Sequence, residues 1–165
     1  MVKDHKDRMS DFAYRMMTVA FILADLVYPS VDRRTKGFSL SEGLTVVDYG
    51  CGPGRYTRRF AKIVGQRGLV YAVDIHELAI EHVKRMMRKR GFNNIKPVLA
   101  EGYYTDIPDD AAEVVLALDM FFGVSEPDKF LQELHRIAKP DGFLIIDDGH
   151  QSRKTTLHKI MQSGL

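Results

Sequence analysis

Three glycines at alternate positions, Gly50, Gly52 and Gly54, follow a short β-branched run that ends at Asp48. A helical pattern begins directly after them. Glycine tolerates positive φ angles and lets a ligand approach the backbone, so strand, glycine turn and helix are typical of a nucleotide-binding unit. The spacing is G-x-G-x-G, which differs from the G-x-G-x-x-G of dinucleotide folds.

The acid before the turn, Asp48, indicates which kind of nucleotide-like ligand the turn would accept. Asp48 would repel a pyrophosphate bound at the helix N-terminus by about 1 kcal/mol in water, and by more once both are desolvated. A ligand that carries an ammonium and a sulfonium group would be attracted instead. We therefore predict that this turn binds S-adenosylmethionine.

The block D-Y-G-C-G-P-G at 48–54, followed by V-Y-A-V-D at 70–74, resembles class I S-adenosylmethionine-dependent methyltransferases. It is most similar to the small-molecule branch that includes the quinone-ring C-methyltransferases, and the resemblance runs from about Leu44 to Asp148. It implies an α/β fold with a doubly wound, mostly parallel, Rossmann-like sheet and helices on both faces. It also implies S-adenosyl-L-methionine as the cofactor and S-adenosyl-L-homocysteine as the product.

The second acid of the expected site is Asp74, at the end of the second predicted strand, where a carboxylate can accept both ribose hydroxyls. Its structural alternative is an N-cap for the helix that starts near His76. Ile75 would pack on the adenine, and the resemblance implies that Glu101 accepts a hydrogen bond from the adenine amino group. The predicted cofactor-binding residues are Asp48, Gly50, Cys51, Gly52, Gly54, Asp74, Ile75, Glu101, Gly102, Leu118 and Asp119.

The chemistry itself asks little of the protein, because the methyl group of a sulfonium is already an electrophile. The chain must align it with an acceptor atom about 3–3.5 Å away and exclude water. A general base is needed only if the acceptor must lose a proton. Asp119 and His150, both after strands at the expected ligand edge, are the candidates, with a structural acid and a surface histidine as alternatives. Cys51 touches a glycine on each side, unlike a nucleophile elbow, and is interpreted as a small turn residue.

Residues 1–40 are expected to form a helical lid or cap. Apolar residues recur there at three- and four-residue steps, at Phe12, Met16, Val19, Ala20, Leu23 and Val27, with Tyr14, Met17 and Phe21 broadening the face. Two interpretations stay open: a helix packed on the domain core, or a Met-rich lid over an apolar substrate pocket. Asp25 disfavours a membrane-surface helix. Pro29 should end the helix, and 30–41 should be a polar connection.

Strand and helix patterns alternate over a cofactor-binding core at 44–150. After the first strand we expect strands at 69–74, 95–99, 113–118 and 143–146, and helices at 55–64, 77–90, 126–139 and 151–163. Residues 140–142 should form a tight turn before a buried fifth strand. In the family that this chain resembles, two more strands usually follow the fifth. Here residues 151–165 are expected to form a C-terminal helix instead. We therefore expect either a shortened chain or a sheet that stops at five strands with an exposed edge.

Composition narrows the class of protein. A chain of 165 residues with 45% hydrophobic content is expected to form one domain, 1–165, and its net charge of +2 does not indicate nucleic acid. The basic run at 84–90 is interpreted as the solvated face of a helix. One cysteine excludes an internal disulfide, and the loop acids Asp106, Asp109 and Asp110 lack a metal-ligand pattern. Without a signal peptide or spanning segment, the sequence predicts a cytoplasmic protein with no integral membrane association.

Three functions compete for this sequence. The first is S-adenosylmethionine-dependent methyl transfer to a small, apolar or aromatic acceptor. Amino groups are disfavoured as acceptors, because Met120 and Phe121 replace the prolines of some amino-group methyltransferases. The second is a non-catalytic S-adenosylmethionine-binding module. The third is an NAD(P)-binding oxidoreductase, against which Asp48 and the missing Tyr-x-x-x-Lys pattern argue. The expected partners are the small-molecule acceptor and, through the unfinished sheet edge, a second copy in a homodimer.

Overall fold

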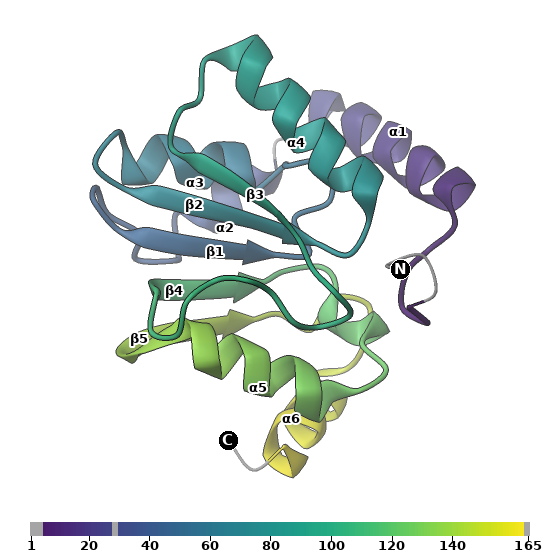
Figure 1. Ribbon diagram of the computed structural model, residues 1–165. Coiled ribbons are helices and arrows are strands. Elements are labelled where there is room, and N and C mark those ends of the chain that lie inside the picture. The colour runs from purple at the N-terminus through teal and green to yellow at the C-terminus, as the bar shows by residue number, and fades with distance from the viewer. Residues whose placement is uncertain (1–4, 28–29, 164–165) are drawn as a thin grey trace.

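A five-stranded parallel sheet organises the molecule (Figure 1). The computed structural model describes residues 5–27 and 30–163. The strands are β1 (Thr45–Tyr49), β2 (Leu69–Asp74), β3 (Ile95–Leu99), β4 (Ala112–Ala117) and β5 (Ala138–Ile146), in the spatial order β3-β2-β1-β4-β5. The order reverses between β1 and β4, which is the place where open α/β sheets bind ligands at the carboxyl ends of their strands.

Helices cover both faces of the sheet, as predicted. Helices α2 (Ser30–Thr35), α3 (Thr57–Val64) and α4 (Glu77–Arg90) share one core cluster with the sheet, and α5 (Pro127–Ile137) shares the other. The 3-10 turn η2 (Phe121–Gly123) follows β4, and α6 (Arg153–Gln162) packs against α5. Adjacent side chains of β1 supply both layers, since Val46 belongs to the first cluster and Val47 to the second, each fully buried. Burial on both faces is typical of parallel strands.

Several predicted boundaries are confirmed, among them β2, β3 and α4 at both ends. Helix α4 ends at Gly91, whose φ of +70° closes the helix in the left-handed conformation. Helix α3 begins at Thr57, two residues later than predicted, because the glycine turn continues through Tyr56. Within the described residues, no helix is long and apolar enough to cross a membrane.

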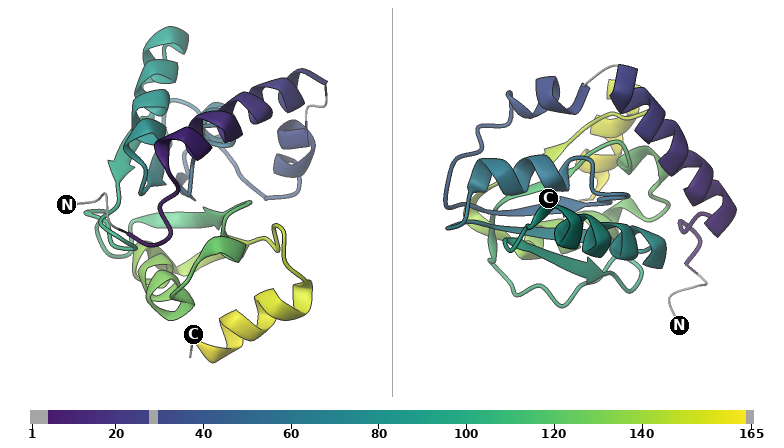
Figure 2. Two further views of the ribbon diagram at one scale, coloured as in Figure 1. Left: turned by 90° about the vertical axis from the view of Figure 1, so that its right-hand side faces the viewer. Right: turned by 90° about the horizontal axis from the view of Figure 1, so that it is seen from above.

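The N-terminal region differs from the sequence prediction in two respects. Helix α1 (Asp11–Val27) lies along the outside of the molecule (Figure 2). Its side chains Phe12, Met16, Val19 and Leu23 are more than half exposed. Of the two interpretations left open for this helix, the one in which these residues pack on the domain core is therefore wrong, because the other apolar side of α1, with Tyr14 and Phe21, faces inward. Residues 30–35 form helix α2 instead of a polar connection. The predicted helix end at Pro29 lies outside the described residues.

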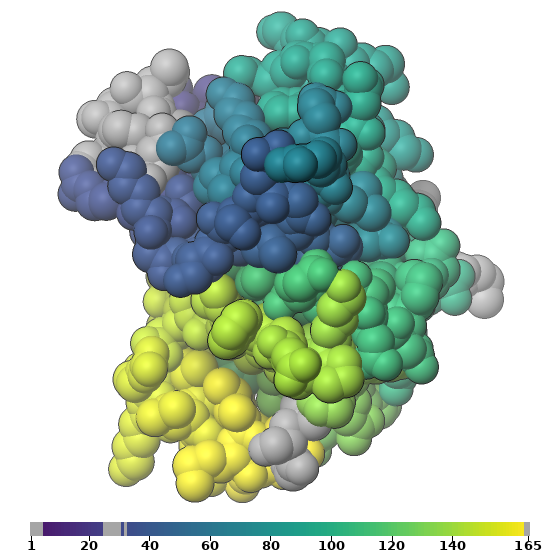
Figure 3. All heavy atoms as spheres, turned by 90° about the vertical axis from the view of Figure 1, so that its left-hand side faces the viewer, coloured from purple at the N-terminus to yellow at the C-terminus, as the bar shows by residue number. Residues whose placement is uncertain are grey.

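The fifth strand is also unlike its prediction. The turn expected at 140–142 is part of β5, which accommodates it as an irregularity in the pairing: a step of two residues on β4, from Ala112 to Val114, corresponds to a step of five on β5, from Ala138 to Phe143. Among the described strands β5 pairs only with β4, so it forms an edge of the sheet. Phe143 is 67% exposed, and the prediction of a buried strand is wrong. Figure 3 shows the side of the molecule at the amino ends of the strands, where β5 and α6 lie below the segment that leads into β1.

Candidate functional site

A cavity of about 250 Å³ lies at the carboxyl ends of β1, β2 and β4. The turn after β1, the end of β2, Met120, and Phe122 and Gly123 of η2 form its floor, and α1 contributes Tyr14, Met17 and Phe21 to its cover. Most of its lining is apolar, with a few polar groups at the strand ends, which is the usual character of a small-molecule site.

The cavity brings together eight of the eleven predicted cofactor-binding residues: Gly50, Cys51, Gly52, Asp74, Ile75, Gly102, Leu118 and Asp119. Three others lie elsewhere. Asp48 is buried behind the turn, Gly54 faces Val83 and Met86 of α4, and Glu101 is exposed beside β3, where it pairs with Tyr104 through the backbone. Contact of Glu101 with a ligand in this cavity therefore stays a prediction.

The glycine turn is shaped by positive φ angles and by β2. Gly50 and Gly52 have φ of +77° and +50°, and the amide N–H groups of Gly50 and Cys51 both donate to the carbonyl of Val73, at 2.8 and 2.9 Å. A Cβ atom added at Gly50 would approach Met120 Cγ to 2.7 Å, whereas at Gly52 no described atom would lie within 4 Å. The backbone at Gly52 therefore borders open space on the cavity side, and a ligand can come close to it.

Asp74 joins the turn to the start of α4. Its carboxylate accepts the N–H of Gly52 at 2.9 Å and the N–H of His76 at 2.8 Å. Burial raises the pKa of Asp74 to about 6, although these N–H donors favour the charged form. Each carboxylate oxygen keeps a lone pair, so the two ribose hydroxyls of a nucleoside fit here. The N-cap of α4 is His76 itself, whose side chain accepts the N–H of Leu78, so the cap alternative for Asp74 is wrong.

Asp48 lies too deep to touch a ligand in the cavity. It is 2% exposed and accepts a hydrogen bond from the hydroxyl of Thr57 at 2.5 Å. Burial raises the pKa of Asp48 to about 7, and the nearby charge of Asp74 adds to this effect. A carboxyl that is partly protonated at neutral pH repels a phosphate less than the sequence argument assumed. Asp74, which lines the cavity, is therefore the acid that a ligand would meet first.

A second polar cluster, which we call the Arg34 cluster, consists of Arg34, Tyr56, Asp119 and Asp147. The Arg34 guanidinium donates to both carboxylate oxygens of Asp119, at 2.9 and 3.1 Å, to the Tyr56 hydroxyl at 2.7 Å, and to Asp147. The Tyr56 hydroxyl in turn donates to Asp119 at 3.0 Å. The cluster therefore ties α2 to the carboxyl ends of β4 and β5.

Asp119 is poorly suited to take up a proton. Partial burial opposes its ionisation, but the Arg34 guanidinium and the Tyr56 hydroxyl outweigh burial and lower the pKa of Asp119. Its φ of +58° is unusual for a residue with a side chain, and its N–H donates to Asp147 at 2.9 Å, which stabilises this conformation. Asp119 lines the cavity as an ionised, fully paired group.

The other candidate base, His150, lies outside the cavity. It is exposed in the loop after β5, and its ring packs edge-on against Phe122 with the ring centroids 4.9 Å apart. Phe122 lines the cavity, whereas His150 does not. The predicted catalytic pair is therefore not brought together, since only Asp119 reaches the cavity.

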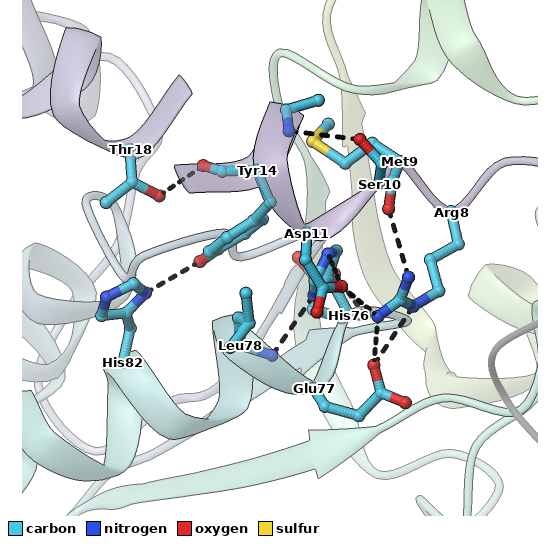
Figure 4. A network of polar contacts seen from close by, with 12 residues as sticks. Arg8, Met9, Ser10, Asp11, Tyr14, Thr18, His76, Glu77, Leu78 and His82 are labelled. Carbon is cyan, nitrogen blue, oxygen red and sulfur yellow. Dashed lines mark hydrogen bonds and ion pairs between the residues drawn. The ribbon is translucent and has the colours of Figure 1, made fainter. Parts of the chain in front are cut away.

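Sequence reasoning expected a lid or cap over 1–40, but it missed the polar pairs that hold the start of this segment over the cavity. Asp7 lines it and accepts hydrogen bonds from the Tyr103 hydroxyl, the Ser125 hydroxyl and the Ser125 N–H. Arg8 donates to Glu77 at 2.8 and 3.1 Å, which fixes the same segment to the start of α4 (Figure 4). The charged run at residues 3–8 of the sequence was a signal for polar contacts in this segment, but it did not identify the partners.

The first turn of α1 continues this cover. The Tyr14 hydroxyl lies 3.2 Å from His82 Nδ1 on α4, and its ring stacks near that of His76, with centroids 4.4 Å apart (Figure 4). Tyr14 is 2% exposed. The inner side of α1 therefore packs on α4 beside the cavity.

The geometry of the site agrees with the comparisons to known proteins. A family model described as a methyltransferase domain matches residues 40–164, and the chain therefore belongs to that family. Together with the five-stranded fold, this places the chain in the family of class I S-adenosylmethionine-dependent methyltransferases. In the described part of the chain, no three His, Cys, Asp or Glu side chains are grouped so that they could hold a metal ion.

Individual relatives agree with this assignment. The chain is 28% identical over 153 residues to a ubiquinone/menaquinone biosynthesis C-methyltransferase of Vibrio campbellii, covering 88% of this chain and 59% of that one. To the Escherichia coli protein of the same description it is 28% identical over 131 residues, which cover 76% and 52%. The chain thus spans about half the length of these curated relatives.

Solved structures show the same fold. A SAM-dependent methyltransferase from Aquifex aeolicus superposes with a TM-score of 0.74 at 31% identity, over 81% of this chain and 78% of that one. The cyclase SpnF superposes with a TM-score of 0.67 at 22% identity, over 86% and 56%. At that identity the likeness concerns the fold alone, and it illustrates that the fold by itself does not determine a reaction.

Proposed function

We propose that this chain transfers a methyl group from S-adenosylmethionine to a small apolar or aromatic acceptor. One observation carries the proposal: the open backbone at Gly52 and the carboxylate of Asp74 face the same cavity, which is otherwise largely apolar. When bound, S-adenosylmethionine supplies a methyl group on a sulfonium, which is already activated for transfer.

The chain's own residues would bind and orient the cofactor and the acceptor, and they would exclude water. Asp74 and the turn would hold the nucleoside, and Ile75 would pack on its base. Aromatic and thioether side chains, among them Met17, Phe21 and Met120, would keep water from the reacting atoms and accept an apolar ring. The relatives named as C-methyltransferases of quinone biosynthesis make an aromatic ring carbon the first acceptor to test.

We propose Asp119 as the residue that contacts the acceptor or the methionine end of the cofactor. Because the Arg34 cluster holds it ionised, it would act as a fixed negative charge and not as a general base. We propose further that the N-terminal residues act as a lid, since Asp7, Tyr14 and Phe21 line the cavity from a segment that precedes the sheet.

The test is transfer of tritiated methyl groups from S-adenosylmethionine to a panel of hydroquinones and phenols with apolar side chains. We expect label in at least one acceptor with the wild-type chain and none with Gly52→Val. Binding of S-adenosylhomocysteine without transfer to any acceptor would contradict the proposal and favour the non-catalytic binding module. Protection by NADH but not by S-adenosylhomocysteine against thermal unfolding would instead favour the oxidoreductase.

A further inference from the structure

The outer side of α1 carries an apolar seam that the domain does not use. Four of its side chains, Phe12, Met16, Val19 and Leu23, follow one another at steps of four, three and four residues. All four are more than half exposed, from 51% to 75%, and the neighbouring Ile22 is 57% exposed. Steps of three and four residues along a helix are the pattern of a seam that packs against another helix.

The two sides of α1 have different tasks. Its inner side contacts the domain through Tyr14 and Phe21, with the Arg55 guanidinium 4.3 Å from the centre of the Phe21 ring. The outer seam is the exposed side of this helix, which itself runs along the outside of the molecule (Figure 2). Ala13 and Ala20, both exposed, flank the seam and would let a second helix approach closely.

The size of the seam suits a second helix of the same kind. The exposed parts of the four seam residues and Ile22 amount to roughly 500 Å², at the upper end of the largest apolar patches of monomers. A standard interface buries about 800 Å² on each partner, of which a polar rim supplies the remainder. A two-fold axis would place the same seam on both partners, so each apolar side chain would meet an apolar side chain.

A lipid surface is a poorer match. Helices that lie on membranes have polar faces rich in Lys and Arg, whereas α1 carries two acids, Asp11 and Asp25, and one base, Arg15. From the spacing, the exposed area and this charge balance, we propose that α1 packs against α1 of a second copy of the chain in a symmetric homodimer. This interface lies on α1 and not at the sheet edge, and it would brace the helix whose inner side lines the cavity.

The test is the oligomeric state of the full chain by sedimentation equilibrium over about 1–100 μM. We expect a dimer for the wild type and a dimer dissociation constant about 100-fold higher or more for Met16→Glu, because a charge would be buried in the seam. Met161→Glu, the same change at an 80% exposed position of α6, is the matched control and should leave the dimer unchanged.

A wild-type chain that stays monomeric at every concentration would overturn the proposal, as would a Met16→Glu variant that dimerises as well as the wild type. A monomer that co-sediments with vesicles of phosphatidylcholine and phosphatidylglycerol would also overturn it, in favour of a membrane surface. Circular dichroism would show whether Met16→Glu is folded. If it is not, Phe12→Ser at the most exposed seam position applies the same test.

Discussion

The floor and the cover of the cavity are held in place by different kinds of interaction. Much of the floor depends on backbone geometry and on hydrogen bonds within the β1–α4 unit, such as the positive φ of Gly52 and the N–H groups that donate to Asp74. The cover, residues 7–27, and the helix α2 with Arg34 that follows it in the chain depend on side-chain pairs such as Asp7 with Tyr103 and Arg34 with Asp119. These partners are 96 and 85 residues apart along the chain.

This contrast determines what a substitution should do. Floor residues such as Gly52 and Asp74 line the cavity itself, so their substitution should affect ligand binding strongly. Most cover pairs are partly exposed, as at Arg34, whose side chain is 38% exposed, and partly exposed ion pairs contribute little on their own. Substitutions in the floor should therefore have larger effects than substitutions in the cover.

Gly52→Val should have the largest effect. A valine at φ +50° is strained by about 1–2 kcal/mol, and its side chain would occupy the space beside the backbone that a ligand needs. We expect binding of S-adenosylhomocysteine to fall by more than about 100-fold in calorimetry. Gly43→Val is the matched control, since Gly43 has φ +89° and also borders open space, but it lies outside the cavity. Equal loss of binding in both variants would contradict the role of the floor.

Asp74→Ala should have the next largest effect. The loss of an acceptor for the ribose hydroxyls and for the N–H of Gly52 should weaken S-adenosylhomocysteine binding by about 1.5–3 kcal/mol. Titration calorimetry measures this difference directly. An unchanged affinity would mean that the ribose is bound elsewhere.

Asp48→Asn should change how stability depends on pH. The folded pKa of Asp48, about 7, lies above the ordinary value of 3.8, so the unfolded chain loses the proton first. Asp48 therefore contributes stability below pH 4 that is lost as pH rises toward 7. Relative to the wild type, Asp48→Asn should gain about 2 kcal/mol of unfolding free energy between pH 5 and pH 7.

Denaturant unfolding at several pH values checks this prediction. Asp74, whose pKa is also raised, acts in the same direction, whereas burial lowers the pKa values of His76 and His82, which act in the opposite direction below pH 6.5. These groups are common to both proteins, so only the difference between them is informative. Parallel pH profiles would show that Asp48 is ionised in the folded protein.

Arg34→Ala should have the smallest effect. It removes the hydrogen bonds to Asp119 and Tyr56 but leaves the floor intact, so stability should fall by about 1 kcal/mol and cofactor affinity should change little. Because the guanidinium lowers the pKa of Asp119, that pKa should rise in the variant, which NMR titration of the carboxyl can follow. A loss of cofactor binding as large as that of Gly52→Val would show that the cover and the floor do not contribute independently to cofactor binding.

The same contrast explains how much could be predicted from the sequence. The floor is encoded locally: the glycine turn, the acid at the end of β2, and the bounds of β2, β3 and α4 follow from spacing and caps. Arg34 stands in a polar run that gives no sign of its partners, because Asp119 and Asp147 meet it only in the folded chain. The exposed side of α1 was misjudged because a helix that is apolar on two sides does not reveal by periodicity which side packs inward.

A crystal structure of the chain grown with S-adenosylhomocysteine tests the central claim most directly. We expect the nucleoside in the cavity beside Gly52, with its ribose hydroxyls on Asp74 and its base against Ile75. S-adenosylhomocysteine bound at another surface, or a diphosphate-bearing nucleotide bound at the turn in competition with it, would contradict this account of the site.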